Sequence, residues 1–349
     1  MKVILDCERM KYPNTGLFEY CHQLGLALIQ SQNKADEVDI YIQKQNQKYF
    51  PDNVNFFNQK SIHKYLFPSL GNDIDIWHAT HQSTWYLPPK SRNIKRVLTI
   101  HDLNFLYEEK TDAKRKNYLK NLQEKINLAD HIVAISEFTK NDINKHLNID
   151  KPLTVIYNGC IVEAYPNFDQ PTYRPANDFI FALGSVNAKK NFHTLPCLVK
   201  NNAMELIIAG NPSSSYVEKI YQEAQAQGVA DRVKVIGTIT EEDKYWYYKH
   251  CSAFALPSIA EGFGIPVIEA MSFGKPVFLS TLTSLPEIGG EHANYFKNFS
   301  PAHMIEVFEA GMKKHSDLNL APSLIQYAGK FNWKRSAEAY WKVYQSLVP

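Results

Sequence analysis

Short apolar runs alternate with longer amphipathic stretches along the whole chain, and this alternation restricts the fold more than any other feature. Runs such as Lys2–Cys7 and His131–Ile135 contain several successive apolar residues, which is typical of strands buried on both faces. Stretches between the runs, such as Leu17–Gln30, repeat apolar residues with the period of a helix. Strand and helix in regular alternation predict parallel sheets covered by helices, which is an α/β fold.

The apolar runs fall into two series that a proline-rich segment separates. Residues 166–178 contain three prolines and few aliphatic residues, and this composition indicates a linker. The predicted strands before the linker are Lys2–Cys7, Val38–Gln43, Ile74–Ala79, Arg96–His101, His131–Ile135 and Leu153–Tyr157. The predicted strands after it are Phe179–Gly184, Glu205–Ala209, Val233–Gly237, Ala253–Pro257 and Pro276–Ser280.

The length of 349 residues exceeds what one hydrophobic core usually supports, so two domains are predicted. We expect a first domain over residues 1–165 and a second over residues 179–332, both doubly wound and Rossmann-like. Doubly wound sheets bind ligands at the carboxyl ends of their strands, so the two domains should face a common cleft. The amphipathic stretch 333–349 is expected to form a C-terminal helix that crosses back to the first domain.

Composition narrows the partners and the compartment. A formal net charge of +2 argues against nucleic acid as the main partner, because proteins that bind a phosphate backbone carry a basic excess. The five cysteines are scattered and form no CxxC pair, which favours reduced thiols in a cytoplasmic protein. No stretch approaches the roughly 18 uninterrupted apolar residues of a membrane span.

The segment Ser258–Met271 carries the strongest chemical signal. A predicted strand ends just before it, Gly262 and Gly264 allow the backbone to approach a ligand closely, and a helix is expected to begin near Pro266. The amides of Gly264, Ile265 and Val267 would then lie at the positive end of a helix dipole, and these amides predict a seat for phosphate.

Two carboxylates share this segment. Glu261 lies in the predicted loop and Glu269 in the first turns of the helix, so both can reach one site. A carboxylate repels phosphate, but it accepts paired hydrogen bonds from the vicinal hydroxyls of a sugar or a ribose. The alternative interpretation is that Glu261 is a surface charge and Glu269 an ordinary acid at a helix start.

Taken whole, Ser258–Met271 resembles the E-x7-E motif of retaining glycosyltransferases with the GT-B fold, in particular glycosyltransferase family 4. The resemblance extends over most of the chain. Other segments that match the family are Thr99–Asp102, Ile135–Lys140, Asn158–Gly159, Gly184–Asn191 and Thr281–Ala293. It implies two Rossmann-like domains and a metal-independent transferase that retains the sugar's configuration and uses a nucleotide-sugar donor, with no cofactor.

The resemblance also implies roles for individual residues. Lys190, helped by Lys189, would stabilise the departing diphosphate, Glu269 would hold the ribose and Glu261 the transferred sugar. Family members often carry arginine where this chain has Ser185 or Lys189, so the cationic part of the site departs from the common pattern. The implied donor-binding residues are Gly16, Ser185, Lys189, Lys190, Gly237, Thr238, Glu261, Gly262, Phe263, Gly264, Ile265 and Glu269. The implied catalytic residues are Glu261, Lys190 and His101.

Histidines in the first domain provide candidates for the acceptor site. His78, His81 and His101 follow or end predicted strands and are expected to line it. They could also imitate a metal cluster, but an HxxH spacing without a helix or a carboxylate at ligand spacing is a weak signal. Asp73-Ile74-Asp75 spells a DxD motif without a nucleotide-binding context. No metal site is predicted.

The expected activity is transfer of mannose, glucose or an N-acetylhexosamine from a GDP- or UDP-sugar to a glycan or lipid-linked acceptor. This would serve polysaccharide or glycoconjugate biosynthesis in the cytoplasm. Residues Lys110–Lys125 form a basic amphipathic pattern, which is either a solvated surface or a peripheral docking face for the anionic inner face of the membrane. Two other functions fit the same fold. One is a nucleotide-sugar 2-epimerase, and the other is a non-catalytic sugar-binding homologue.

Overall fold

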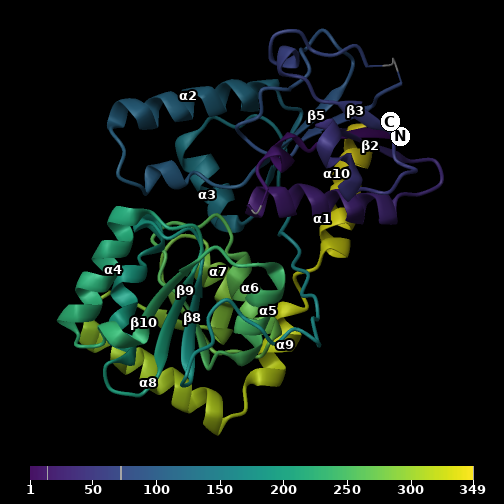
Figure 1. Cartoon of the computed structure of the whole chain (residues 1–349). Helices are drawn as coiled ribbons and strands as arrows, with labels where there is room; N and C mark the ends of the chain where they lie inside the picture. Colours follow the sequence, from purple (N-terminus) through teal and green to yellow (C-terminus); the bar gives the residue numbers. More distant parts are fainter. Residues whose placement is uncertain (14, 71–72, 349) are drawn as a thin grey trace. The chain divides into compact units, whose positions relative to one another are not determined.

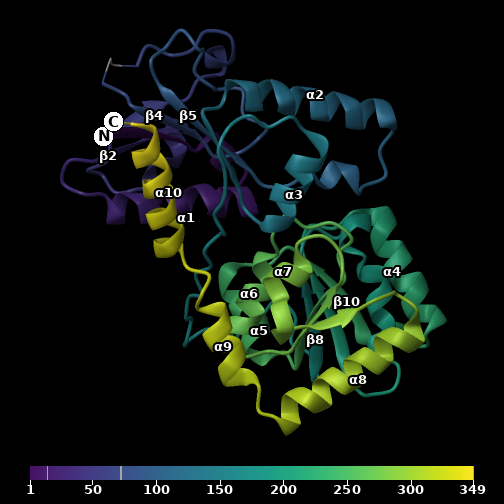
Figure 2. The same ribbon diagram turned by 180° about the vertical axis from the view of Figure 1, so that it is seen from behind.

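The structure is a computed structural model that describes residues 1–13, 15–70 and 73–348. The chain divides into two compact units, one made of residues 1–159 and 331–349 and the other of residues 160–330. Each unit contains a parallel sheet with helices on both faces (Figures 1 and 2). The predicted fold class, α/β with two doubly wound Rossmann-like domains, is confirmed.

The first unit's sheet contains, within the described residues, seven parallel strands in the order β3-β2-β1-β4-β5-β6-β7. Their bounds are Lys2–Asp6 (β1), Glu37–Ile42 (β2), Phe56–Asn58 (β3), Ile76–Ala79 (β4), Lys95–Ile100 (β5), His131–Ala134 (β6) and Leu153–Val155 (β7). The strand order reverses between β1 and β4, and ligands bind at such a reversal in doubly wound sheets.

Two helices from opposite ends of the chain lie side by side on one face of this sheet. They are α1 (Gly16–Ser31) and α10 (Trp333–Leu347) (Figures 1 and 2). The buried residues of α10 include Ala337, Tyr340 and Tyr344, which recur with helical spacing. The hydroxyl groups of Tyr20 and Tyr340 lie 2.6 Å apart and join the two helices. The core on the other face includes side chains from α2 (Asp112–Leu128) and α3 (Glu137–His146).

The second unit's sheet has six parallel strands in the order β10-β9-β8-β11-β12-β13, and all of its residues are described. Their bounds are Phe179–Leu183 (β8), Glu205–Ala209 (β9), Val233–Gly237 (β10), Ala253–Leu256 (β11), Val277–Ser280 (β12) and Asn294–Phe296 (β13). The helices are Ser214–Ala226 (α4), Glu241–His250 (α5), Ile265–Ser272 (α6), Leu285–Gly289 (α7), Pro301–Asp317 (α8) and Ala321–Ala328 (α9). Here the order reverses between β8 and β11.

Two strands, β3 and β13, are absent from the sequence prediction. Each is three residues long and lies at the edge of its sheet, with partly exposed side chains. Three residues are too few to show a strand period.

Residues 166–178, which composition indicates as a linker, lie within the second unit. The Thr172 hydroxyl donates to Asp243 Oδ2 at 2.8 Å, and the Tyr173 amide donates to the Tyr247 hydroxyl at 2.9 Å. Both acceptors belong to α5, so hydrogen bonds hold this proline-rich segment against the unit that follows it.

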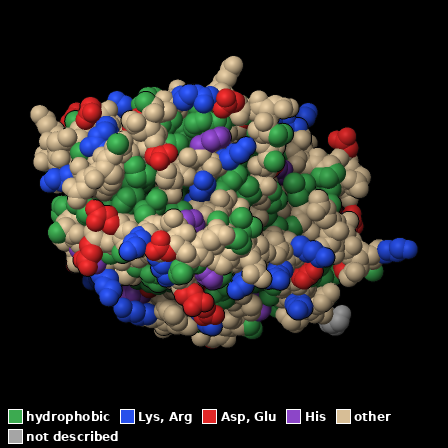
Figure 3. Space-filling model, turned by 90° about the horizontal axis from the view of Figure 1, so that it is seen from below, with side chains coloured by type: hydrophobic (Ala, Val, Ile, Leu, Met, Phe, Trp, Pro, Cys, Tyr) green, Lys and Arg blue, Asp and Glu red, His purple; other side chains and the backbone are tan. Residues whose placement is uncertain are grey.

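Charged side chains of both signs are interspersed on the face that Figure 3 presents. Among the helices within the described residues, none is both long and apolar enough to cross a bilayer.

Candidate active site

The candidate site is assembled where the strand order of the second unit reverses. The segment after β8 contains Lys189 and Lys190, and the segment after β11 contains Glu261. Because β8 and β11 are neighbours in the sheet, these two segments lie next to each other. A hydrogen bond of 2.9 Å from the amide of Ile259 to the carbonyl of Lys189 ties them together.

An ion pair joins the two predicted catalytic residues of this unit. Lys190 Nζ lies 2.5 Å from Glu261 Oε1, and each side chain is only 12% exposed. Gly184 makes room for the lysine, because a Cβ atom at this glycine would lie 2.7 Å from Lys190 Cε. Gly184 also has a φ of +147°, which other residues rarely adopt. Lys190 can therefore take this position only because residue 184 has no side chain.

Opposing effects act on the Glu261 carboxyl. Burial acts to raise its pKa, but the positive charge and hydrogen bond of Lys190 and the charge of Lys189 outweigh burial, so the pKa is lowered from its ordinary value. The carboxylate therefore stays ionised and remains a hydrogen-bond acceptor.

Neighbouring residues hold the backbone of this loop. The amide of Glu261 donates to Thr283 Oγ1 at 2.9 Å, and Ser284 Oγ donates to the carbonyls of Glu261 and Phe263 at 2.9 and 3.0 Å. Thr283 has a φ of +54°, an uncommon conformation for a β-branched residue. The segment between β12 and α7 thus fixes the backbone of the Glu261 loop through hydrogen bonds.

Helix α6 presents its amino end beside Glu261. Gly264 caps the helix in the left-handed conformation, with a φ of +110°, and Ile265 is its first residue. The amide of Val267 donates to the carbonyl of Gly264 at 3.0 Å, so one of the three amides expected to seat phosphate is already engaged. The amides of Gly264 and Ile265 have no acceptor within the described residues. These two are placed to bind an anion.

Glu269 is buried and has a hydrogen-bond donor on each carboxylate oxygen. Lys244 Nζ lies 2.9 Å from Oε1, and the Tyr248 hydroxyl donates to Oε2 at 2.8 Å. Burial acts to lower the pKa of Lys244, but the charges of Glu269, Tyr245 and Glu241 together outweigh it and raise the pKa. Lys244 also pairs with Glu241 at 2.7 Å. Each carboxylate oxygen accepts two hydrogen bonds, so Glu269 keeps capacity for a pair of hydroxyl groups.

Lys244 and Tyr248 were not identified from the sequence. They are four residues apart on α5 and therefore project from the same side of that helix. The spacing alone is a usable signal, but the surrounding run of aromatic residues hides which side of α5 faces α6.

The remaining donor-site candidates of the second unit lie along the carboxyl edge of its sheet. Ser185 is exposed just after β8, and Thr238 is exposed just after β10. Gly237 ends β10 with a φ of +77°, and its carbonyl accepts a hydrogen bond of 2.7 Å from Gly210. Gly262 and Phe263 are buried between Glu261 and the start of α6.

In the first unit, His101 follows β5 and is buried. Its Nε2 lies 2.8 Å from the carbonyl of Thr80, and its amide donates to Gln82 Oε1 at 2.9 Å. Burial, together with the charge of Arg9, lowers the pKa of His101 to about 4 despite the hydrogen bond to Thr80. The imidazole is therefore neutral at physiological pH and interacts through hydrogen bonds.

His78 and His81 differ in their surroundings. His78 is 0% exposed, with Nδ1 2.7 Å from the Tyr344 hydroxyl and Nε2 2.8 Å from Thr99 Oγ1. It joins α10 to the sheet and does not face an acceptor. His81 is partly exposed, and its ring centroid lies 5.2 Å from that of His101. The structure therefore brings the rings of His81 and His101 together, while Tyr344 and Thr99 engage both ring nitrogens of His78.

Gly16 is the exposed first residue of α1, which Thr15 caps by accepting a hydrogen bond of 3.3 Å from the amide of Phe18. Among the residues that the structure describes, none would lie within 4 Å of a Cβ atom at Gly16. The described structure does not itself require a glycine here, which leaves a close approach to a ligand as a reason for one.

The DxD-like aspartates lie at the opposite edge of the first sheet. Asp75 Oδ2 accepts a hydrogen bond of 2.7 Å from the amide of Lys2, and Asp73 lies 3.3 Å from Lys2 Nζ. Both therefore contact the start of β1. Among the described residues, no group of three or more His, Cys, Asp or Glu side chains is arranged to hold a metal ion.

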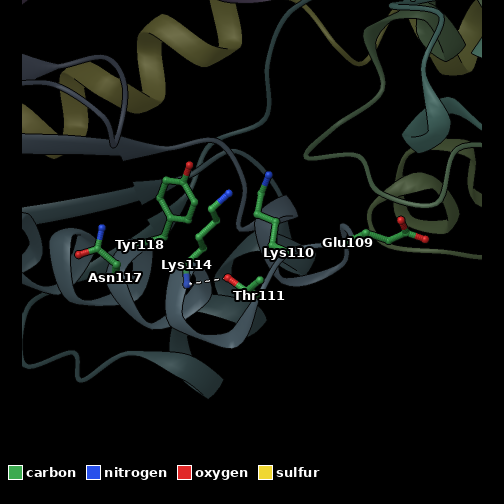
Figure 4. A pocket seen from close by; sticks show the side chains of 6 residues that line it. All are labelled: Glu109, Lys110, Thr111, Lys114, Asn117 and Tyr118. Carbon is green, nitrogen blue, oxygen red and sulfur yellow. Dashed lines mark hydrogen bonds between the residues drawn. The ribbon is translucent and has the colours of Figure 1, made fainter. Parts of the chain in front are cut away.

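A hollow of about 360 Å³ lies at the start of α2, within the basic stretch of the sequence. Figure 4 shows the ends of Lys110, Lys114 and Tyr118 directed to the same side, while Glu109 points away from them. Lys110 also pairs with Glu108 at 2.9 Å. The beginning of α2 thus gathers cations around a polar hollow.

Comparisons with known proteins cover both units. The family model described as "Glycosyltransferase Family 4" matches residues 30–163, and the model described as "Glycosyl transferases group 1" matches residues 167–330. O-antigen chain mannosyltransferase B of Escherichia coli is 25% identical over 329 residues, covering 83% of this chain and 85% of that protein.

Two further comparisons agree with these matches. GDP-mannose:cellobiosyl-diphosphopolyprenol alpha-mannosyltransferase of Komagataeibacter xylinus is 26% identical over 227 residues, covering 62% of this chain and 56% of that protein. Among solved structures, Anabaena HepE in complex with UDP and glucose has a TM-score of 0.70 at 16% identity, with 99% of this chain and 100% of that chain covered. The latter likeness shows the fold.

Proposed function

Because this chain belongs to the glycosyltransferases of group 1 and family 4, we propose that it is a retaining, metal-independent hexosyltransferase. It transfers a hexose from a GDP- or UDP-sugar to a glycan or lipid-linked acceptor in polysaccharide or glycoconjugate biosynthesis. The observation that carries this proposal is the ion pair of Lys190 and Glu261 beside the amino end of α6.

The second unit supplies the groups that such a transfer needs. The bond between the sugar's anomeric carbon and the donor phosphate breaks, and charge develops on the departing diphosphate. Lys190 has three N–H groups and uses one on Glu261, so two remain for phosphate oxygens. The amides of Gly264 and Ile265 add hydrogen bonds to the same anion. This charge stabilisation needs no metal ion.

Retention follows most simply from attack on the front face of the sugar. The acceptor oxygen forms the new bond to the anomeric carbon on the side that the phosphate leaves, and the phosphate takes the acceptor's proton. The alternative is a double displacement with Glu261 as nucleophile. The Lys190 pair lowers the pKa of Glu261, which weakens it as a nucleophile and suits it to accept hydrogen bonds from the sugar hydroxyls.

Glu269 is the proposed contact for the donor's ribose, because Lys244 and Tyr248 hold it buried and oriented. The donor sugar favoured first is mannose, since the related proteins from Escherichia coli and Komagataeibacter xylinus are named as mannosyltransferases. UDP-glucose is the second candidate, since HepE is described with UDP and glucose.

Thermal-shift measurements with GDP, UDP, GDP-mannose and UDP-glucose test the donor. We expect one nucleotide and its sugar to raise the melting temperature of the wild type, and the Glu269→Gln variant to lose most of that rise. Product analysis with acceptor then tests the reaction. Nucleotide diphosphate release that needs an acceptor supports transfer, whereas release without one, with an epimerised free sugar, contradicts it.

The proposed location is the cytoplasm, with peripheral contact at the anionic inner face of the membrane through α2. Lys114, Lys116 and Lys120 are exposed on this helix. Since each lysine near an anionic surface contributes about 1 kcal/mol, changing all three to glutamate should reduce sedimentation with anionic liposomes by about tenfold or more. Arg115 stays unchanged in this variant, because it donates to the carbonyl of Glu108 at 3.0 Å. Equal sedimentation of variant and wild type would remove the membrane from the proposal.

A further inference from the structure

A partly buried lysine without a carboxylate partner lies at the carboxyl edge of the first unit's sheet. Lys125, in the last turn of α2, donates to the carbonyl of Gln82 at 2.9 Å. Within the described part of the chain, no carboxylate lies at ion-pair distance from its Nζ. Burial, together with the charge of Arg9, lowers the pKa of Lys125. A cation withdrawn from water without an opposite charge is costly, and a bound anion would offset that cost.

Arg9 brings a second cation to the same edge, because Thr80 and Thr84 of the loop after β4 donate to the carbonyl and the carboxylate of Asp6 at the end of β1, at 2.6 and 2.8 Å. Arg9 belongs to the turn Glu8–Lys11 that follows β1, and its side chain is 15% exposed. The charge of Arg9 contributes to the lowered pKa of Lys125, His81 and His101. These three groups come from α2 and from the ends of β4 and β5, so one positive field covers the carboxyl ends of three neighbouring strands.

The acidic residues nearby do not cancel this field. Glu8 pairs with Arg9 at 3.3 Å and also with Lys11, so one carboxylate faces two cations. Asp6 is buried and accepts hydrogen bonds from Thr84 Oγ1 and from the amide of Glu8. Burial and the charge of Glu8 raise the pKa of Asp6 to about 7, which makes it a weak counter-charge. Glu124, the residue before Lys125, acts to raise the pKa of Lys125, but burial and the charge of Arg9 outweigh it. Three cations, Arg9, Lys11 and Lys125, therefore face the two ionised carboxylates of Glu8 and Glu124.

An exposed aromatic ring borders these cations. Trp85 is 69% exposed, and Lys125 Nζ lies 5.7 Å from the centroid of its ring. The indole offers a flat apolar face against which the apolar face of a sugar ring can stack. The loop after β4 therefore places a stacking surface directly beside a cation that lacks an anion.

We propose that the first unit binds a phosphoryl group of the acceptor here, with Arg9 and Lys125 holding its oxygens and Trp85 stacking on the adjacent sugar. This inference rests on the proposed function, since only a transferase has an acceptor. A guanidinium binds two phosphate oxygens in parallel, and an ammonium acts as a point charge beside it. A phosphate or diphosphate has at least three oxygens to share between the two cations, whereas a sugar carboxylate has two.

Inorganic pyrophosphate is the probe, measured by isothermal titration calorimetry on the whole chain. The proposed function places pyrophosphate at Lys190, and this inference places another at Lys125. We expect the wild type to bind at both, Lys190→Met to keep the Lys125 site, Lys125→Met to keep the Lys190 site, and the double variant to bind at neither. Lys125→Arg should retain binding. Lys145→Met, which removes an exposed lysine from α3 of the same unit, is the matched control and should behave as the wild type.

The outcomes separate the two proposals. Loss of all binding in Lys190→Met overturns the first-unit site and leaves the transferase proposal intact. Binding that depends on Lys125 alone supports the first-unit site and contradicts the role of Lys190. Because Lys125→Met could unfold the helix end, Arg9→Gln provides a second variant. It should weaken the Lys125-dependent site by about tenfold, and an unchanged affinity in a folded Arg9→Gln protein contradicts the proposal.

Discussion

Charged side chains are paired at the carboxyl edge of the second unit's sheet but only partly paired at that of the first unit's sheet. In the second unit, Glu261 and Glu269 are each paired with a lysine at 2.5 and 2.9 Å. In the first unit, within the described residues, Asp6 has no cation and Lys125 no carboxylate at ion-pair distance, and His101 is kept neutral by burial. At the edge of the second unit, each of these carboxylates has a cation without any ligand. At the edge of the first unit, Lys125 has no anion at ion-pair distance within the described residues.

This difference indicates two ways of preparing a site for a charged substrate. The lysines of the second unit keep its carboxylates ionised and oriented before the donor arrives, so little reorganisation is needed on binding. The first unit instead retains a positive field that a ligand must complete. We therefore expect variants of the second edge to lose donor chemistry abruptly, and variants of the first edge to change acceptor binding or stability.

The largest effect is expected from the Lys190–Glu261 pair. Glu261→Gln removes the negative charge that balances Lys190 and replaces one of two acceptor oxygens with a donor, while Lys190→Met removes the cation that stabilises the leaving diphosphate. Each should lower kcat/KM by about a hundredfold to a thousandfold, the range seen when one preorganised group is removed. Steady-state assays of nucleotide diphosphate release measure this.

Glu309→Gln, which changes an exposed glutamate on α8 of the same unit, is the control and should keep full activity. A loss below tenfold in both Glu261→Gln and Lys190→Met would contradict the central place of the pair.

A smaller effect is expected from Lys244, because it acts on the donor through Glu269. Lys244→Met leaves a buried carboxylate without its cation, so the dissociation constant for the donor should rise by a factor of about 10 to 100. Lys244→Arg should restore most of the affinity. A purely structural role would lower the melting temperature of the free protein without changing donor affinity at 25 °C, so both quantities are measured. Equal donor affinity in wild type and Lys244→Met contradicts the positioning role.

Much of the second edge was readable from the sequence because its parts are contiguous. The glycines, both carboxylates and the helix start occur within Ser258–Met271, and Gly184 and Lys190 occur within one short loop. Lys244 was not readable in the same way. Its role depends on which side of α5 faces α6, and a helix made largely of aromatic residues has no clear apolar stripe to show it.

The first edge was harder to predict, because a histidine near a strand end can face either the core or the solvent. His78 and His101 look alike in the sequence, but only the packing of α10, which lies far along the chain, encloses His78. The strand pattern predicted most of both sheets, since fully buried strands read as apolar runs. It missed β3 and β13, because each has only three residues at the edge of its sheet, too few to show a strand period.

The smallest effect concerns stability in acid, and at the first edge it comes from buried histidines. Burial lowers the pKa of His78 to about 3 and that of His101 to about 4, against about 6.5 for an unfolded histidine. Below about pH 6.5, these two histidines are protonated in the unfolded chain but stay neutral in the folded chain. The free energy of unfolding therefore falls as the pH is lowered towards 4. At pH 5 each of these histidines should remove about 2 kcal/mol of the free energy of unfolding, relative to pH 7.5.

Urea unfolding at pH 5 and pH 7.5 measures this difference in the free energy of unfolding. His78→Asn cannot titrate and should shrink it. A pH effect of equal size in wild type and His78→Asn would show that His78 takes up its proton without unfolding, and that the first edge tolerates a charge on His78.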